Sequence, residues 1–241
     1  MTKSVAPGLE AVGLVAGALW SDTDGDGWVD LVLALDWGPV AVWRNAEGKL
    51  SDATAAAGLA GHTGWWHGVT SGDFDGDGDI DLIATNLGRN TKYGASRDQP
   101  LELFFDDFDD NGTLDLVEAG YEGTEHYPLR GRSCSSRAMP FIADKFDTFA
   151  SFAEAEVETI YSDEVLDGAP VRRATTLDST LFVNDGSGAF EPRALPTLAQ
   201  VSPGFGVAVA DVDADGHLDA LVAQNFFNAQ PETGLLDGGL G

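Results

Sequence analysis

One nine-residue pattern, Asp-x-Asp-x-Asp/Asn-Gly-x-x-Asp, occurs four times in this chain of 241 residues and strongly limits how the chain can fold. The copies begin at Asp22, Asp73, Asp107 and Asp211. At positions 1, 3, 5 and 9 of these copies every side chain is Asp except Asn111. Carboxylates held this close repel one another unless a cation is shared among them. The pattern therefore predicts four cation-binding loops.

Calcium is the cation that this spacing favours. A hard divalent ion takes six to eight oxygen ligands, and Gly at position 6 permits the sharp turn that brings them together. We expect side chains at positions 1, 3, 5 and 9, and the carbonyl at position 7, to hold up to four Ca²⁺ ions. A solvated acidic turn is the alternative for any single copy, and repetition in register argues against it. The predicted ligands are Asp22, Asp24, Asp26, Trp28, Asp30, Asp73, Asp75, Asp77, Asp79, Asp81, Asp107, Asp109, Asn111, Thr113, Asp115, Asp211, Asp213, Asp215, His217 and Asp219.

The flanks of the loops distinguish them from EF-hands. An EF-hand needs helices on both sides and a bidentate Glu at position 12, and only Glu118 meets the second condition. Short apolar runs precede and follow each loop, for example 16–20 and 31–34 around the first copy. Such runs are typical of buried strands. Each copy is therefore predicted to be a β-hairpin whose turn binds calcium.

Repetition of the hairpin predicts an all-β fold, a β-propeller of four-stranded blades. The loop starts are 51, 34 and 104 residues apart, so we place blades at about 1–60, 61–100, 101–198 and 199–241. The third blade should contain strands over 181–190 and a helical insertion at about 134–170, where apolar residues recur at three- and four-residue steps. The first 15 residues are expected to form the outer strand of a preceding blade.

The repeated Asp-x-Asp-x-Asp-Gly-x-x-Asp-Leu hairpins resemble FG-GAP/VCBS repeats, the calcium-loop blades of integrin α-chain propellers. Residues 72–82, 85–88 and 127–132 are similar to bacterial VCBS-repeat proteins of the cartilage-acidic-protein/UnbV kind, in which such stretches lead into a helical insert. This resemblance implies a seven-bladed or similar ring, of which the chain supplies roughly four blades, so a fragment is expected. It also implies that the calcium loops share one face and the other loops lie on the opposite face.

Charge and composition exclude several classes of partner. The 40 acidic and 13 basic residues give a net charge of -27, so binding to nucleic acid or to anionic membranes is not expected. No apolar run reaches membrane-spanning length, and the single Cys134 excludes an internal disulfide. The N-terminus lacks an apolar signal core. Calcium loops nevertheless suit millimolar calcium, and we expect an extracellular, cell-surface or periplasmic protein.

Catalytic motifs are sparse in this sequence. The histidines lack zinc-ligand spacing, and the Ser elbow of hydrolases does not occur. We therefore predict a non-enzymatic module for recognition or adhesion. The alternatives are the propeller of a polysaccharide-active enzyme, or its accessory domain, and a structural spacer.

A protein or glycan ligand is expected on the face opposite the calcium loops. Aromatic residues and arginines dominate binding hot spots, and several fall in loops assigned to that face. The alternative is that the tryptophans pack between blades and the arginines pair with surplus acid. The candidate ligand-binding residues are Trp65, Trp66, His67, Asn90, Tyr93, Arg97, Arg130 and Arg132.

Overall fold

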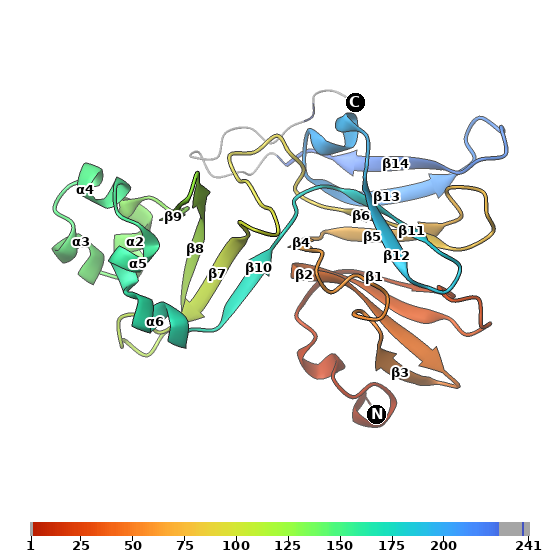
Figure 1. Cartoon of the computed structure of the whole chain (residues 1–241), viewed down its shortest axis with the longest axis horizontal. Helices are drawn as coiled ribbons and strands as arrows, with labels where there is room; N and C mark the ends of the chain where they lie inside the picture. Colours follow the sequence, from red (N-terminus) through yellow and green to blue (C-terminus); the bar gives the residue numbers. More distant parts are fainter. Residues whose placement is uncertain (1, 227–237, 239–241) are drawn as a thin grey trace. The chain divides into compact units, whose positions relative to one another are not determined.

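A computed structural model describes residues 2–226 and 238 and divides the chain into two compact units. The discontinuous unit comprises Met1–Lys92 and Thr176–Gly241, and the inserted unit comprises Tyr93–Thr175. Both contain antiparallel sheets, and the inserted unit adds short helices (Figure 1). The predicted all-β class with a small helical insertion is confirmed. Among the described residues, no helix has the length and apolar character needed to cross a membrane.

The first sheet of the discontinuous unit is a complete blade. Its elements are β1 (Leu14–Ser21), β2 (Asp30–Ala46), β3 (Lys49–Asp52) and β4 (Thr63–Trp65). The N–H of Asn45 donates to Asp30 Oδ1 across 2.9 Å, whereas fifteen extended residues would span about 50 Å. Strand β2 therefore turns back on itself, and Trp37 near its middle has a positive φ of 54°. The two halves of β2 supply the second and third strands of the blade.

The second sheet joins segments that are far apart in the sequence. Its order is β12 (Phe190–Ala194), β11 (Thr180–Asn184), β6 (Asp81–Thr85) and β5 (Gly68–Gly72), with Phe182 opposite Leu82. The predicted third blade at 101–198 is therefore wrong in its composition, because its strands over 181–190 belong to the second blade. Local sequence patterns identify strands, but the sheet that a strand joins depends on which apolar face it covers.

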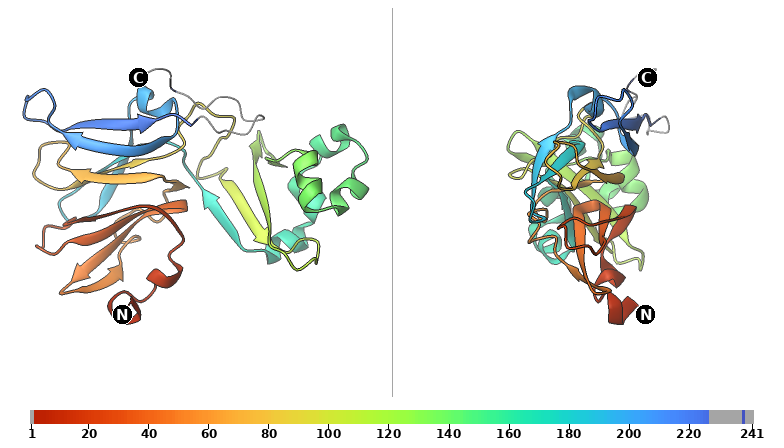
Figure 2. Two further views of the ribbon diagram at one scale, coloured as in Figure 1. Left: turned by 180° about the vertical axis from the view of Figure 1, so that it is seen from behind. Right: turned by 90° about the vertical axis from the view of Figure 1, so that its right-hand side faces the viewer.

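The third blade of this unit begins with β13 (Gly204–Ala210) and β14 (Asp219–Gln224), preceded by η2 (Thr197–Gln200). Strand β5 lies between β1 and β13. A Cβ added to Gly68 would come within 2.7 Å of the Phe205 carbonyl oxygen, so glycine is needed for this close approach. Figures 1 and 2 show the β1–β2, β5–β6 and β13–β14 loops at the same end of their strands. The rest of the predicted blade at 199–241 falls largely outside the described residues.

The N-terminal residues form helical turns instead of the predicted outer strand. Helix α1 (Thr2–Val5) and the 3-10 helix η1 (Leu9–Ala11) precede β1. Ala6, Leu9 and Val12 pack against a cluster on the first sheet. Their three-residue spacing places them on one face of a helical turn, which explains why this segment is not extended.

The main core of the discontinuous unit lies between its first two sheets. Val32 and Ala34 of β2 face it, while Leu33 and Leu35 face the N-terminal cluster, as the alternation of a strand requires. Trp66 is fully buried in this core and contacts Phe182, with ring centroids 5.6 Å apart. The two blades are therefore joined by a continuous apolar layer.

The inserted unit has its own sheet and core. Its strands are ordered β10 (Val171–Ala174), β7 (Leu101–Asp106), β8 (Asp115–Glu122) and β9 (Glu125–Pro128). Apolar side chains of the sheet, including Phe104 and Val117, pack with helical residues such as Ile142 and Ile160. The helices occupy 132–168, close to the predicted 134–170; they are α2 (Arg132–Ala138), α3 (Phe141–Lys145), α4 (Phe149–Ala153), α5 (Val157–Tyr161) and α6 (Asp163–Gly168).

A cluster of ionisable side chains links α5 to this sheet. His126 Nδ1 lies 2.7 Å from Glu158 of α5, and its Nε2 lies 3.4 Å from Glu102 of β7. Arg173 of β10 pairs with Glu102 across 2.6 Å, and Tyr121 stacks on the His126 ring. These contacts connect α5 to β7, β9 and β10.

Candidate metal centres

The four acidic loops share one set of internal hydrogen bonds. The position 1 carboxylate accepts the N–H of the position 6 glycine in every copy. The distances are 2.9 Å for Asp22–Gly27, 3.1 Å for Asp73–Gly78, 2.7 Å for Asp107–Gly112 and 3.0 Å for Asp211–Gly216. The position 9 carboxylate accepts the N–H of position 2, at 2.9 to 3.2 Å. Hydrogen bonds thus join position 1 to position 6 and position 2 to position 9 in each loop.

The backbone of the loops needs two left-handed residues each. Position 6 is glycine in all four copies, with φ between 86° and 97°. Position 4 also has a positive φ in every copy, and here two copies do not use glycine: Asp110 at 56° and Ala214 at 61°. The turn therefore brings the side chains of positions 1 and 3 close together in every loop.

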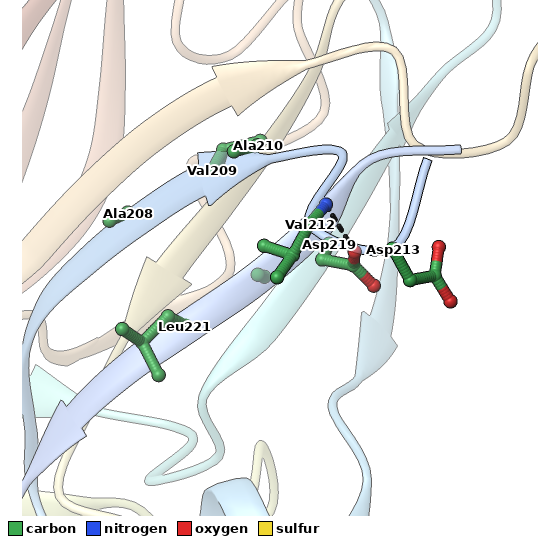
Figure 3. Close-up of a pocket in the computed structure, with 8 residues that line it drawn as sticks. Ala208, Val209, Ala210, Val212, Asp213, Asp219 and Leu221 are labelled. Carbon is green, nitrogen blue, oxygen red and sulfur yellow. Dashed lines mark hydrogen bonds between the residues drawn. The ribbon is translucent and has the colours of Figure 1, made fainter. Parts of the chain in front are cut away.

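Three carboxylate oxygens converge in every loop. They lie within 4.8 Å of one another and come from positions 1, 3 and 9 in the second, third and fourth loops, but from positions 1, 3 and 5 in the first. Figure 3 shows the fourth loop, where the Val212 N–H donates to Asp219 beside Asp213. The converging groups are Asp22, Asp24 and Asp26; Asp73, Asp75 and Asp81; Asp107, Asp109 and Asp115; and Asp211, Asp213 and Asp219.

The chemistry of these groups fits a hard cation. All converging atoms are carboxylate oxygens, the donors that calcium prefers. Within the described residues, Asp109 Oδ1 is buried without a hydrogen-bond partner. Burial raises the pKa of Asp115, and the nearby charges of Asp109 and Asp107 raise it further. Desolvation and the charges of Asp77 and Asp81 likewise raise the pKa of Asp75. A divalent ion would relieve this repulsion, so each group could hold one.

Positions 5 and 7 form a separate contact. The N–H of position 7 donates to the position 5 side chain in all four loops, at 2.7 to 2.9 Å. In the second, third and fourth loops the position 5 side chains Asp77, Asn111 and Asp215 thus stabilise the turn. Coordination by the position 7 carbonyls stays a prediction. The fourth loop borders a pocket of about 510 Å³, which is lined by apolar residues of β13, β14 and the loop together with Asp213 and Asp219 (Figure 3).

The predicted ligand-binding residues do not all reach a surface. Trp66 is fully buried, and its Nε1–H donates to the His62 carbonyl, so its assignment to a binding face is wrong. Burying the large apolar surface of a tryptophan stabilises the fold, so a tryptophan beside apolar strands favours the core over solvent. Trp65 is half-buried against Trp37, and His67 contacts the Gly204 carbonyl at 3.0 Å.

The arginines of this set have defined structural contacts. Arg132 donates to the carbonyls of Phe146 and Ala143 and lies over the Phe149 ring, so it supports the helical layer. Arg130 is exposed and pairs with Glu118 across 2.8 Å. Arg97 and Asn90 are exposed and Tyr93 is half-buried. Trp65, Trp66, His67 and Asn90 belong to the discontinuous unit and the other four to the inserted unit, so a shared surface stays a prediction.

The sequence patterns missed three residues that act on the loops. Asn45 and Asn184 donate their N–H groups to the position 9 carboxylates Asp30 and Asp81. Arg44 pairs with Asp30 and Asp24 of the first loop. A signal was present, because Trp43-Arg44-Asn45 and Phe182-Val183-Asn184 align as the ends of equivalent strands.

Comparison with known families agrees with this geometry. The model of the FG-GAP-like repeat family matches residues 22–84 and 173–222. The two matched segments contain the first, second and fourth loops and the strands β11 and β12, and the match omits most of the inserted unit. No curated protein matches the chain. Two segments of this protein thus carry FG-GAP-like repeats with acidic clusters typical of calcium sites.

Proposed function

We propose that this protein is a non-enzymatic, calcium-stabilised propeller module used for extracellular recognition or adhesion. The observation that supports it is the fourfold recurrence of one loop, with equivalent hydrogen bonds and three converging carboxylate oxygens each time. In a loop that binds calcium, the ion would join the two ends of the loop and neutralise carboxylates that otherwise repel. Ion binding and folding are then linked.

The type of ion site supports a proposal for the cellular location. Short loops with several exposed carboxylates suit millimolar calcium, which is found outside the cytosol. We therefore place the protein at the cell surface, in the periplasm or in the extracellular medium. Its resemblance to integrin α-chain blades and to the cartilage-acidic-protein/UnbV kind of repeat protein supports a recognition role over a purely structural one.

The partner would be a protein or a glycan bound away from the calcium loops. Exposed Arg97 and Arg130, both in the inserted unit, are residues of the predicted set that a ligand could reach. A glycan array and a protein-interaction screen, both in millimolar calcium, would separate the two partner classes. Loss of the identified interaction in Arg97→Ala, with an unchanged melting temperature, is the expected result. Binding that survives substitution of both arginines would reject this surface.

Thermal unfolding tests the role of calcium. We expect the melting temperature to fall by many degrees when EDTA replaces millimolar calcium, because bound ion stabilises only the folded state. Magnesium at the same concentration should restore little of the loss, since it demands a smaller octahedral site. Superimposable unfolding curves in EDTA and calcium would contradict the proposal.

A further inference from the structure

The first loop differs from the other three in its counter-charge. We propose that the Arg44 guanidinium takes the place of a metal ion in this loop, so that three of the four loops bind calcium at ordinary concentrations. The inference rests on the proposed calcium function and assigns the first loop a role of its own. That role is to join the first blade to the second through the positively charged Arg44 side chain.

The contacts of Arg44 are those of a partly buried ion pair. Its Nη1 lies 2.6 Å from Asp30 Oδ2 and 3.2 Å from Asp24 Oδ2, and it also donates to Thr23 Oγ1. The Arg44 side chain is 17% exposed and that of Asp30 is 1% exposed. Charge-assisted bonds to a carboxylate out of solvent are strong and costly to break. The guanidinium therefore occupies the region between the position 3 and position 9 carboxylates.

The orientation of Asp30 shows the consequence. In the other loops the position 9 carboxylate joins the converging oxygens, whereas Asp30 does not. Its Oδ2 accepts from the Thr23 N–H, the Thr23 hydroxyl and Arg44, and its Oδ1 accepts from Asn45. Asp81, at the same position of the second loop, accepts from the N–H groups of Phe74 and Asn184. Thr23 and Arg44 thus supply the additional donors.

Two residues of the second blade hold this arrangement. Arg44 Nη2 donates to the Gly188 carbonyl across 2.9 Å, and Asn184 Nδ2 donates to the Thr23 carbonyl across 2.9 Å. A Cβ on Gly188 would overlap Arg44 Nη2, so a larger residue at this position would displace the guanidinium. A calcium ion entering the first loop would be repelled by the guanidinium and would have to displace it from both blades.

Counting bound calcium tests the inference directly. Native mass spectrometry and equilibrium dialysis should find three ions on the wild type and a fourth on Arg44→Val. The first loop of Arg44→Val should bind calcium at least about tenfold more tightly than the first loop of the wild type. Valine is the residue at the equivalent position 183. Arg193→Val removes the same charge from an exposed side chain and should leave the count at three. Four equivalent sites in the wild type, or a folded Arg44→Val that still binds three ions, would overturn it.

A terbium measurement reports on the first loop alone. Trp28 occupies position 7 of this loop, where the others have Asp79, Thr113 and His217, so it can sensitise terbium bound there. Trp28→Phe should leave the tryptophan-excited terbium emission of the wild type unchanged, and should reduce that of Arg44→Val. A reduced emission in the wild-type background would overturn the inference even if Arg44→Val failed to fold. Absence of calcium from every loop of the wild type would instead reject the proposed function.

Discussion

Position 4 of the acidic loops is where single residues carry backbone strain. Ala214 has a φ of 61° there, a conformation in which a Cβ is unfavourable. Gly25 and Gly76 occupy the same position in the first two loops. We expect Ala214→Gly to raise the free energy of unfolding of the discontinuous unit by about 1 kcal/mol, after the entropy of the unfolded glycine is counted.

Denaturant titration in saturating calcium measures this change. Asp110→Gly is the matched control, because Asp tolerates the left-handed region through its short polar side chain. The gain at position 110 should therefore be smaller. A lower free energy of unfolding for Ala214→Gly would show that the alanine stabilises the loop by more than its backbone strain destabilises it.

His67 gives the discontinuous unit a pH dependence. Burial lowers the pKa of His67, while its contact with the Gly204 carbonyl and the charge of Asp36 oppose this shift. The unfolded chain then binds the proton more readily, so stability present above the ordinary value of 6.5 is lost as the pH falls below it. Burial raises the pKa of Asp36; its contribution has the opposite sign and is lost as the pH rises.

The substitution His67→Gln isolates the histidine contribution. Glutamine keeps a neutral donor for the Gly204 carbonyl but does not titrate. Denaturation between pH 8 and pH 5 in excess calcium should show the wild type losing more stability than His67→Gln. Parallel pH profiles for the two proteins would mean that His67 is protonated as readily in the folded state as in the unfolded one.

At the scale of elements, the second blade is interrupted where the first has a tight turn. The first blade passes from its second to its third strand near Trp37 within β2, whereas β6 and β11 are separated by the whole inserted unit. The Gly88 N–H donates to the Leu177 carbonyl across 2.7 Å, so the two ends of the interruption are adjacent. The inserted unit therefore lengthens the connection between β6 and β11, and the pairing of these two strands does not require that length.

Replacing Tyr93–Thr175 by a short Gly-Ser linker should leave the blade intact. We expect the shortened protein to keep the β-sheet circular dichroism and to bind one calcium ion fewer, because the third loop is removed with the inserted unit. Native mass spectrometry and circular dichroism in calcium provide the measurement. An unfolded product in saturating calcium would show that β6 and β11 depend on the inserted unit.

The sequence allowed prediction of the hairpins and of the acidic residues that converge, because both depend on residues within nine positions of one another. Two features could not be predicted in that way. The pairing of β11 with β6 depends on apolar faces about a hundred residues apart, and Arg44 enters the first loop only because β2 folds back on itself. The helical turns at the N-terminus were also not predicted. Their apolar residues are stabilised by packing on the first sheet, and that contact is not visible in the local sequence.

At the scale of the whole molecule, the acidic loops divide between two cores. The first, second and fourth loops belong to the discontinuous unit and the third to the inserted unit. Each unit buries its own apolar clusters. Loss of one loop should therefore destabilise the core to which its hairpin belongs.

The pair Asp107→Ala and Asp73→Ala tests this division by hydrogen exchange in saturating calcium. Each change removes a converging carboxylate and an acceptor of two loop N–H groups, at an expected cost of about 2 kcal/mol or more. Asp107→Ala should speed exchange in β7, β8 and the helices while β5, β6 and β11 keep their protection, and Asp73→Ala should do the reverse. Equal loss of protection in both units from either substitution would show that they unfold as one, since a local defect would then reach both cores.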